Sequence, residues 1–380
     1  MASNSVVILA IDGGGIRGII PAFILNQIEI ELNKPCFRLF DIIGGTSTGA
    51  ILTAGLTTPN PSDTVNRLPY SAQTMLDIYV NDGAQIFVKQ SGLDPMEATY
   101  YSSNGNQGIE PFLQTNLGAK LRLSDAMSIT QGQPGARIKQ MFTTGCIVNS
   151  GGGVVAHPVT GKDEGAYLFN WYDAARNGTP DNYYVWEAAR SSSAAPSYFP
   201  IAHVGGGLSG RSSAAEKWVI DGGVMSNNPA MWAIAEAFRM GLAQTLSDIT
   251  IVSIGTGFYP GAGGVGIHNN AGWGFPDNGN WSLAPWMAPD MYDLQGQQNS
   301  GTLVNIILDA VQNVAAQQLQ LMQYGGLNYF RLEPNIPYSL SQMDNITPTN
   351  IANLQKAAAN YIKPGGAGYT LFGQVLNALV

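Results

Sequence analysis

Charged side chains are scarce in this sequence, in which Asp, Glu, Lys and Arg make up 12% of 380 residues. The net charge is −8 and Lys and Arg form no run, which argues against a nucleic-acid partner, because phosphate backbones require a basic face. No uncharged apolar run reaches the ~18 residues that cross a bilayer, so we expect no transmembrane segment. The start of the chain lacks the basic residues of a secretory signal. We therefore expect a soluble protein, cytoplasmic by default, with non-Sec export as an open alternative.

Cysteine and histidine are also rare. The two cysteines, Cys36 and Cys146, cannot build a disulfide framework and do not have metal-ligand spacing. We expect both to fill the core and predict no metal site. The three histidines are His157, His203 and His268. Their scarcity matters because histidine is the usual base of a catalytic serine.

Apolar segments of strand type alternate with segments of helical spacing, which predicts an α/β fold. Strands are predicted at 6–11, 40–44, 137–148, 166–171, 218–220 and 249–254, and helices at 19–32, 48–56, 71–87, 185–196, 229–240, 303–322 and 349–362. Residues 95–118 are expected to be irregular. This order indicates a mostly parallel central sheet with helices on both faces. We expect a single domain over 1–380, with its motifs within 6–257 and a helical extension over about 300–380.

A candidate nucleophile lies in the sequence Gly45-Thr46-Ser47-Thr48-Gly49, between a predicted strand and an apolar helix. Gly45 and Gly49 permit a sharp turn that exposes the hydroxyl of Ser47, and the start of the helix directs its positive end at that residue. This setting is typical of a nucleophilic serine.

A second glycine turn, Gly13-Gly14-Gly15-Ile16-Arg17-Gly18, follows the first predicted strand and opens a helix. Its unbonded N–H groups can stabilise a developing negative charge beside Ser47. Gly13, Gly15 and Gly18 also satisfy a dinucleotide-binding pattern, but that pattern needs an acid at the far end of the next strand. Asp41 lies at the beginning of that strand instead, so nucleotide binding is the weaker alternative.

Asp221 is the best candidate for the base. It ends a predicted strand and precedes Gly222 and Gly223, which allow close backbone approach. A partly desolvated carboxylate can accept the proton of an acidified serine. A triad of Ser47, Asp221 and His268 stays open, although His268 lies in a loop of Gly and Asn with no apolar wall to hold its ring.

Together these motifs resemble those of the patatin-like phospholipases, which are lipid acyl hydrolases with a Ser-Asp dyad. The resemblance is carried by residues 12–18, 45–49 and 221–223, with flanking segments at 193–200, 227–229 and 253–257. It implies a three-layer fold, a lipid ester substrate, an acyl-serine intermediate and no metal or organic cofactor, and it allows peripheral contact with a membrane or micelle. The roles it implies are nucleophile for Ser47, base for Asp221, oxyanion hole for Gly13, Gly14 and Gly15, and support for Arg17, Gly18, Gly45, Gly49, Gly222 and Gly223.

Two features leave alternatives open. Arg17 either contacts a lipid phosphate or, as we favour, pairs with a carboxylate such as Asp12. The long loop 261–290 and its border form either a lid, an interfacial anchor or a packed aromatic loop; its large side chains are Trp273, Phe275, Trp281, Trp286, Met287 and Met291. The remaining functional alternatives are a Ser-Asp-His esterase and a non-enzymatic module that binds lipid or nucleotide.

Overall fold

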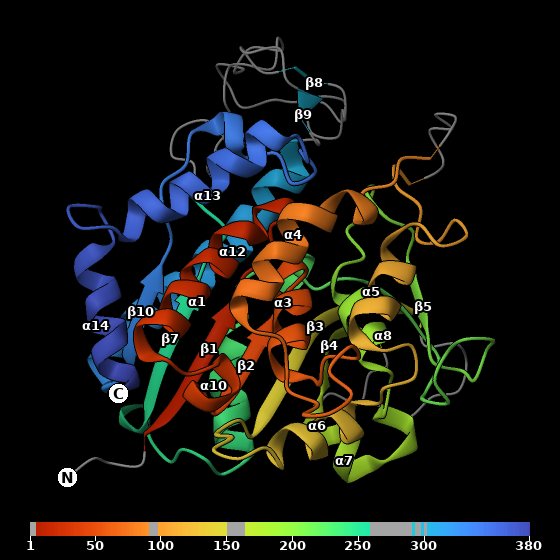
Figure 1. The fold of residues 1–380 in the computed structure, drawn as a ribbon, viewed down its shortest axis with the longest axis horizontal. Coiled ribbons are helices and arrows are strands. Elements are labelled where there is room, and N and C mark those ends of the chain that lie inside the picture. Colours follow the sequence, from red (N-terminus) through yellow and green to blue (C-terminus); the bar gives the residue numbers. More distant parts are fainter. Residues whose placement is uncertain (1–4, 91–97, 150–163, 259–290, 293–297, 300–301) are drawn as a thin grey trace, which may run out of the picture.

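The computed structural model describes residues 5–90, 98–149, 164–258, 291–292, 298–299 and 302–380. A twisted sheet runs through the middle of the molecule, and helices cover it in front and behind (Figure 1). The strands of this sheet are β1 (Val6–Ile11), β2 (Ile42–Gly45), β3 (Gln140–Asn149), β4 (Gly165–Asn170), β5 (Ala202–Val204), β6 (Lys217–Asp221), β7 (Ile249–Ile254) and β10 (Asn328–Leu332). A separate short pair is formed by β8 (Met291–Tyr292) and β9 (Gln298–Asn299).

The strand order is β10-β7-β1-β2-β3-β6-β5, and β4 pairs with β3. The five strands from β10 to β3 are parallel, whereas β4, β5 and β6 join by antiparallel pairing. The predicted mostly parallel α/β sheet is thus confirmed, with an antiparallel extension beyond β3.

Alternate residues of β1 divide the core into two layers. Val7, Leu9 and Ile11 belong to one apolar cluster, and Val6, Ile8 and Ala10 belong to a second one. The first cluster packs against α1 (Ile19–Leu32), α3 (Thr48–Thr57), α4 (Ala72–Ile86), α5 (Ile109–Leu117), α6 (Leu123–Gln131), α7 (Trp171–Asn177), α8 (Val185–Ser192), α13 (Pro348–Ile362) and α14 (Tyr369–Leu379). The second packs against α10 (Ala230–Arg239) and α12 (Thr302–Met322). Because successive strand residues point to opposite faces, this division produces the three layers.

The bounds predicted for β1, β7 and α1 are reproduced residue for residue. The interpretation of 95–118 as irregular is wrong, because α5 occupies Ile109–Leu117 and buries Ile109, Phe112, Leu113 and Leu117. Those four residues have helical spacing, which the glycine- and asparagine-rich flanks hid. The C-terminal segment is also not purely helical, since β10 joins the central sheet beside β7.

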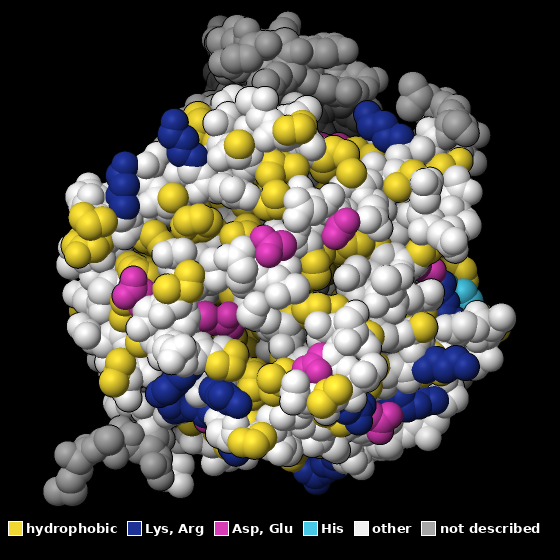
Figure 2. Space-filling view, in the orientation of Figure 1, with side chains coloured by type: hydrophobic (Ala, Val, Ile, Leu, Met, Phe, Trp, Pro, Cys, Tyr) yellow, Lys and Arg dark blue, Asp and Glu magenta, His cyan; other side chains and the backbone are white. Residues whose placement is uncertain are grey.

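Charged side chains are sparse on the face drawn in Figure 2, where they lie scattered among polar and hydrophobic ones. Lys and Arg side chains lie mainly along the lower rim of this view. Among the described helices, none is long and apolar enough to cross a bilayer.

Candidate active site

Ser47 lies in the turn between β2 and α3, with φ +54° and ψ −119°. Residues other than glycine rarely adopt these backbone angles, so contacts with the surrounding residues must hold the turn in this conformation. Its N–H donates to Ser192 Oγ at 2.9 Å. A Cβ added to Gly49 would lie 2.1 Å from the carbonyl oxygen of Ile11, which is far inside a permitted contact. The glycine after Ser47 therefore allows α3 to pack directly on the end of β1.

Asp221 is the last residue of β6 and lies level with Ser47. The register of β3 explains this, because Thr143 pairs with Gly45 on one side and Gly145 pairs with Asp221 on the other. The buried carboxylate accepts the N–H of Gly223 at 2.7 Å, and the Ser47 side chain lies close enough to it to lower its pKa. The structure thus brings together the hydroxyl and the carboxylate that the sequence singles out.

Burial raises the pKa of Asp221 from 3.8 to about 7. The N–H of Gly223, the side chain of Ser47 and the positive charge of Arg190 lower this pKa again, by a smaller amount. A carboxylate with this pKa accepts a proton about as readily as an imidazole, whose ordinary value is about 6.5. Desolvation therefore supplies the basicity that a carboxylate in water does not have.

The first glycine turn lies against Ser47, since β1 and β2 are parallel neighbours. A Cβ added to Gly13 would lie 3.0 Å from Ser47 Cβ. The N–H of Gly13 already donates to the carbonyl of Asn227 at 3.2 Å. Among the described residues, the N–H groups of Gly14 and Gly15 donate no hydrogen bond. Two of the three glycines thus carry N–H groups that have no hydrogen-bond acceptor within the part of the chain that the structure describes.

Arg17 does not form an ion pair with Asp12, the carboxylate that the sequence suggested as an example of its partner. Its guanidinium donates to the carbonyl oxygens of Gly14 and Gly257, at 3.3 and 3.5 Å. The cation that pairs with Asp12 is Arg331 of β10, whose Nη2 lies 2.6 Å from Asp12 Oδ2. The error arose because the sequence neighbourhood offered Arg17 as a partner, while the fold brings β10 within reach.

The nucleotide alternative is not supported at Asp41. This residue precedes β2, at the opposite edge of the sheet from the glycine turn, and its carboxylate is bonded to Arg137 and to the N–H of Val7, both at 2.8 Å. Among the described residues, no group of three or more His, Cys, Asp or Glu could hold a metal ion.

Of the histidines, His203 lies on β5, where its ring stacks on Trp218 and Nε2 lies 2.7 Å from Glu216 Oε1. His157 and His268 lie outside the described residues, as do Trp273, Phe275, Trp281, Trp286 and Met287. Met291 begins the short strand β8.

The end of α8 holds both turns of the candidate dyad, which the sequence did not indicate. Ser192 receives the N–H of Ser47 on its hydroxyl and the N–H of Gly222 on its carbonyl, the latter at 3.3 Å. The next contact is from the N–H of Asp221 to the carbonyl of Ala194, at 3.0 Å. A single helix end therefore sets the position of the nucleophile relative to the carboxylate.

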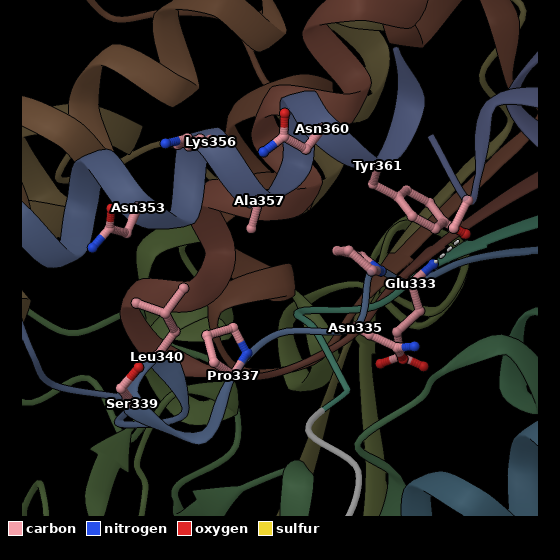
Figure 3. Close-up of a pocket in the computed structure, with 12 residues that line it drawn as sticks. Glu333, Asn335, Pro337, Ser339, Leu340, Asn353, Lys356, Ala357, Asn360 and Tyr361 are labelled. Atoms are coloured by element: carbon pink, nitrogen blue, oxygen red, sulfur yellow. Dashed lines mark hydrogen bonds between the residues drawn. The ribbon is translucent and has the colours of Figure 1, made fainter. Parts of the chain in front are cut away.

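A cavity of about 560 Å³ lies away from this centre, between the loop after β10 and α13. Figure 3 shows Lys356 and Asn360 on α13 above it, with Glu333 at its border. None of its lining residues belongs to the two turns around Ser47. Glu333, which lines the cavity, also forms an ion pair with Arg331, with 2.9 Å between Oε2 and Nη2.

The chain is similar to known proteins of one family. A model of the family described as patatin-like phospholipase matches residues 9–121 and 158–234, half of the chain. Patatin-like protein 2 of Arabidopsis thaliana is 28% identical over 95% of this chain and 83% of that protein. Probable inactive patatin-3-Kuras 1 of Solanum tuberosum is 25% identical over 94% of this chain and 86% of its own length. The solved structure of VipD from Legionella pneumophila aligns with 99% of this chain and 67% of that chain, with 10% identity and a TM-score of 0.38.

Proposed function

Because this chain belongs to the patatin-like phospholipase family, whose members are generally lipid acyl hydrolases, we propose that it cleaves carboxylic ester bonds of lipids, as a phospholipase A or a nonspecific lipid acyl hydrolase. The catalytic groups in this proposal are Ser47 and Asp221. The reaction needs no metal or organic cofactor. Because the substrate is held in a lipid aggregate, the proposal includes transient contact with a membrane or micelle surface.

In the first step, Ser47 Oγ attacks the acyl carbonyl carbon while Asp221 takes the hydroxyl proton. The negative charge that develops on the carbonyl oxygen accepts hydrogen bonds from the N–H groups of Gly14 and Gly15. Gly13 shapes the turn, since its own N–H is bonded to Asn227. The ester bond then breaks, and the leaving alcohol receives the proton from Asp221.

In the second step, water attacks the acyl-serine and gives its proton to Asp221. Collapse of this intermediate returns the proton to Ser47 and releases the fatty acid. Each group ends in its starting state, so the dyad completes the cycle without a histidine.

The observation that carries the proposal is the meeting of the Ser47 side chain with the buried carboxylate of Asp221, whose pKa that side chain lowers. Three features accompany it: a strained backbone at Ser47, a carboxylate of raised pKa, and two N–H groups that donate to no other described residue. Acyl transfer requires these three components together.

The decisive test is labelling with a fluorophosphonate, which reacts with activated serines. We expect the wild-type chain to be labelled and Ser47→Ala to be unlabelled, with the exposed Ser62→Ala as the matched control that keeps full labelling. Hydrolysis of a p-nitrophenyl ester should fall by about 10³-fold or more in Asp221→Asn. Retained hydrolysis in that variant, with loss in His268→Ala, would favour the triad instead. A wild-type chain that is never labelled would indicate a lipid-binding module.

A further inference from the structure

A network of polar side chains closes into a ring through the backbone of the first glycine turn. We call it the polar ring; its members are Asp12, Asn227, Gln312, Arg331 and Glu333. Arg331 Nη2 lies 2.6 Å from Asp12 and 2.9 Å from Glu333. Gln312 donates to Glu333 at 3.0 Å and accepts from Asn227 at 2.8 Å. The ring closes where Asn227 Nδ2 approaches the carbonyl oxygen of Gly13 at 3.4 Å, next to Asp12.

Asp12 depends on this ring for its charge balance. Its side chain is fully buried, and its Oδ1 has no hydrogen-bond partner among the described residues. Burial raises the pKa of Asp12, and the charge of Arg331 is the main influence that lowers it. Arg331 is the one cation paired with Asp12 among the described residues. A buried carboxylate that loses its paired cation is strongly unfavourable, so we expect Arg331 to stabilise the chain at Asp12, directly after β1.

The missing side chain of Gly255 leaves space for two members of the polar ring. A Cβ added to Gly255 would lie 2.3 Å from Glu333 Oε1 and 2.8 Å from Arg331 Nη2. The adjacent Thr256 donates its hydroxyl to the carbonyl of Gly13 at 2.8 Å. Within the segment 253–257, contact with the ring thus accounts for the glycine at position 255, and contact with the glycine turn accounts for the threonine at position 256.

The polar ring contacts the first glycine turn at the peptide that joins Gly13 to Gly14. The carbonyl of Gly13 and the N–H of Gly14 belong to the same trans peptide and point in opposite directions. Thr256 and Asn227 both hold that carbonyl. Their hydrogen bonds therefore fix the direction in which the N–H of Gly14 points.

We propose that Arg331, Glu333 and Gln312 are positioning residues of the esterase, which hold the Gly13–Gly14 peptide in the orientation that stabilises the oxyanion. This inference rests on the proposed function. All three residues come from α12, β10 and the loop that follows, beyond the part of the chain that the family model matches. The C-terminal segment is then a part of the catalytic architecture, in addition to covering the sheet.

The test compares Arg331→Met with the wild type in steady-state hydrolysis of a soluble p-nitrophenyl ester. We expect kcat to fall about 10- to 100-fold with KM changed less than about threefold, because an oxyanion contact acts mainly in the transition state. The double variant Asp12→Asn/Arg331→Met removes both charges and should recover at least about tenfold of the loss. Arg239→Met is the matched control, since Arg239 pairs with Asp173 and Glu236 and has no contact with the turn.

A folded Arg331→Met variant with wild-type kcat would overturn the inference, and so would a rise in KM at unchanged kcat. If Arg331→Met does not fold, Gln312→Met replaces it as the test, because this substitution opens the ring without leaving a buried charge. A loss in kcat of about fivefold in Gln312→Met supports the inference, and an unchanged kcat overturns it. Fluorophosphonate labelling of the wild type is measured in parallel. An inactive, unlabelled wild type would overturn the proposed function itself and the inference with it.

Discussion

Asp221→Asn should inactivate the protein and at the same time stabilise it, by an amount that grows with pH. In the unfolded chain the carboxyl ionises above its ordinary pKa of 3.8, whereas burial in the folded protein raises this pKa to about 7. The protonated carboxyl is the form that the fold prefers. The stability associated with this group is therefore fully present below pH 3.8 and is lost as the pH rises through about 7.

The magnitude follows from the two pKa values by proton linkage. The free energy lost relative to a permanently neutral group is about 2 kcal/mol at pH 5 and about 4 kcal/mol at pH 8. Asparagine has nearly the same shape as aspartate and does not ionise. Any part of the change in unfolding free energy that does not depend on pH cancels when the values at the two pH values are subtracted. The contribution of Asp12 cancels between wild type and variant, because both proteins contain it.

The assay is denaturant-induced unfolding of both proteins at pH 5 and pH 8. We expect the stability of Asp221→Asn relative to wild type to increase by roughly 2 to 3 kcal/mol between these values. The exposed Asp77 on α4, changed to Asn, is the matched control for the loss of one negative charge. A relative stability that is equal at both pH values, or that falls, would refute the view that burial makes Asp221 basic.

Three further predictions concern the same centre. Ester hydrolysis should increase about tenfold from pH 6 to pH 8, because the base must be ionised and its pKa is about 7; a flat profile would contradict this. Arg190→Met should shift the midpoint of that profile to higher pH, since Arg190 lowers the pKa of Asp221; a shift to lower pH would be inconsistent with its charge. Gly222→Ala should cost more than about 2 kcal/mol in thermal unfolding and Gly223→Ala less than about 1 kcal/mol. An alanine Cβ at 222 would lie 2.0 Å from Thr144 Oγ1, whereas one at 223 would lie 3.0 Å from its nearest neighbour; equal losses would refute this reasoning.

The sequence determined those parts of the protein that depend on consecutive residues. Continuous apolar runs predicted β1 and β7 because a strand buried on both faces has no polar side, and helical spacing predicted α1. The turn at Ser47 was also visible, since the glycines that allow it lie two residues away on either side. Local rules failed at α5, where polar flanks hid the helical spacing of four buried residues.

Only the tertiary structure decided which of these local features meet. Asp221 reaches the level of Ser47 because β6 runs antiparallel to a long β3 in one particular register, and no local pattern encodes that register. In the same way, the partner of Asp12 is a residue 319 positions away, although Arg17 is five positions from it. Ion pairs of buried groups are selected by the packing of strands and helices in three dimensions, so the polar ring could not be derived from motifs along the chain.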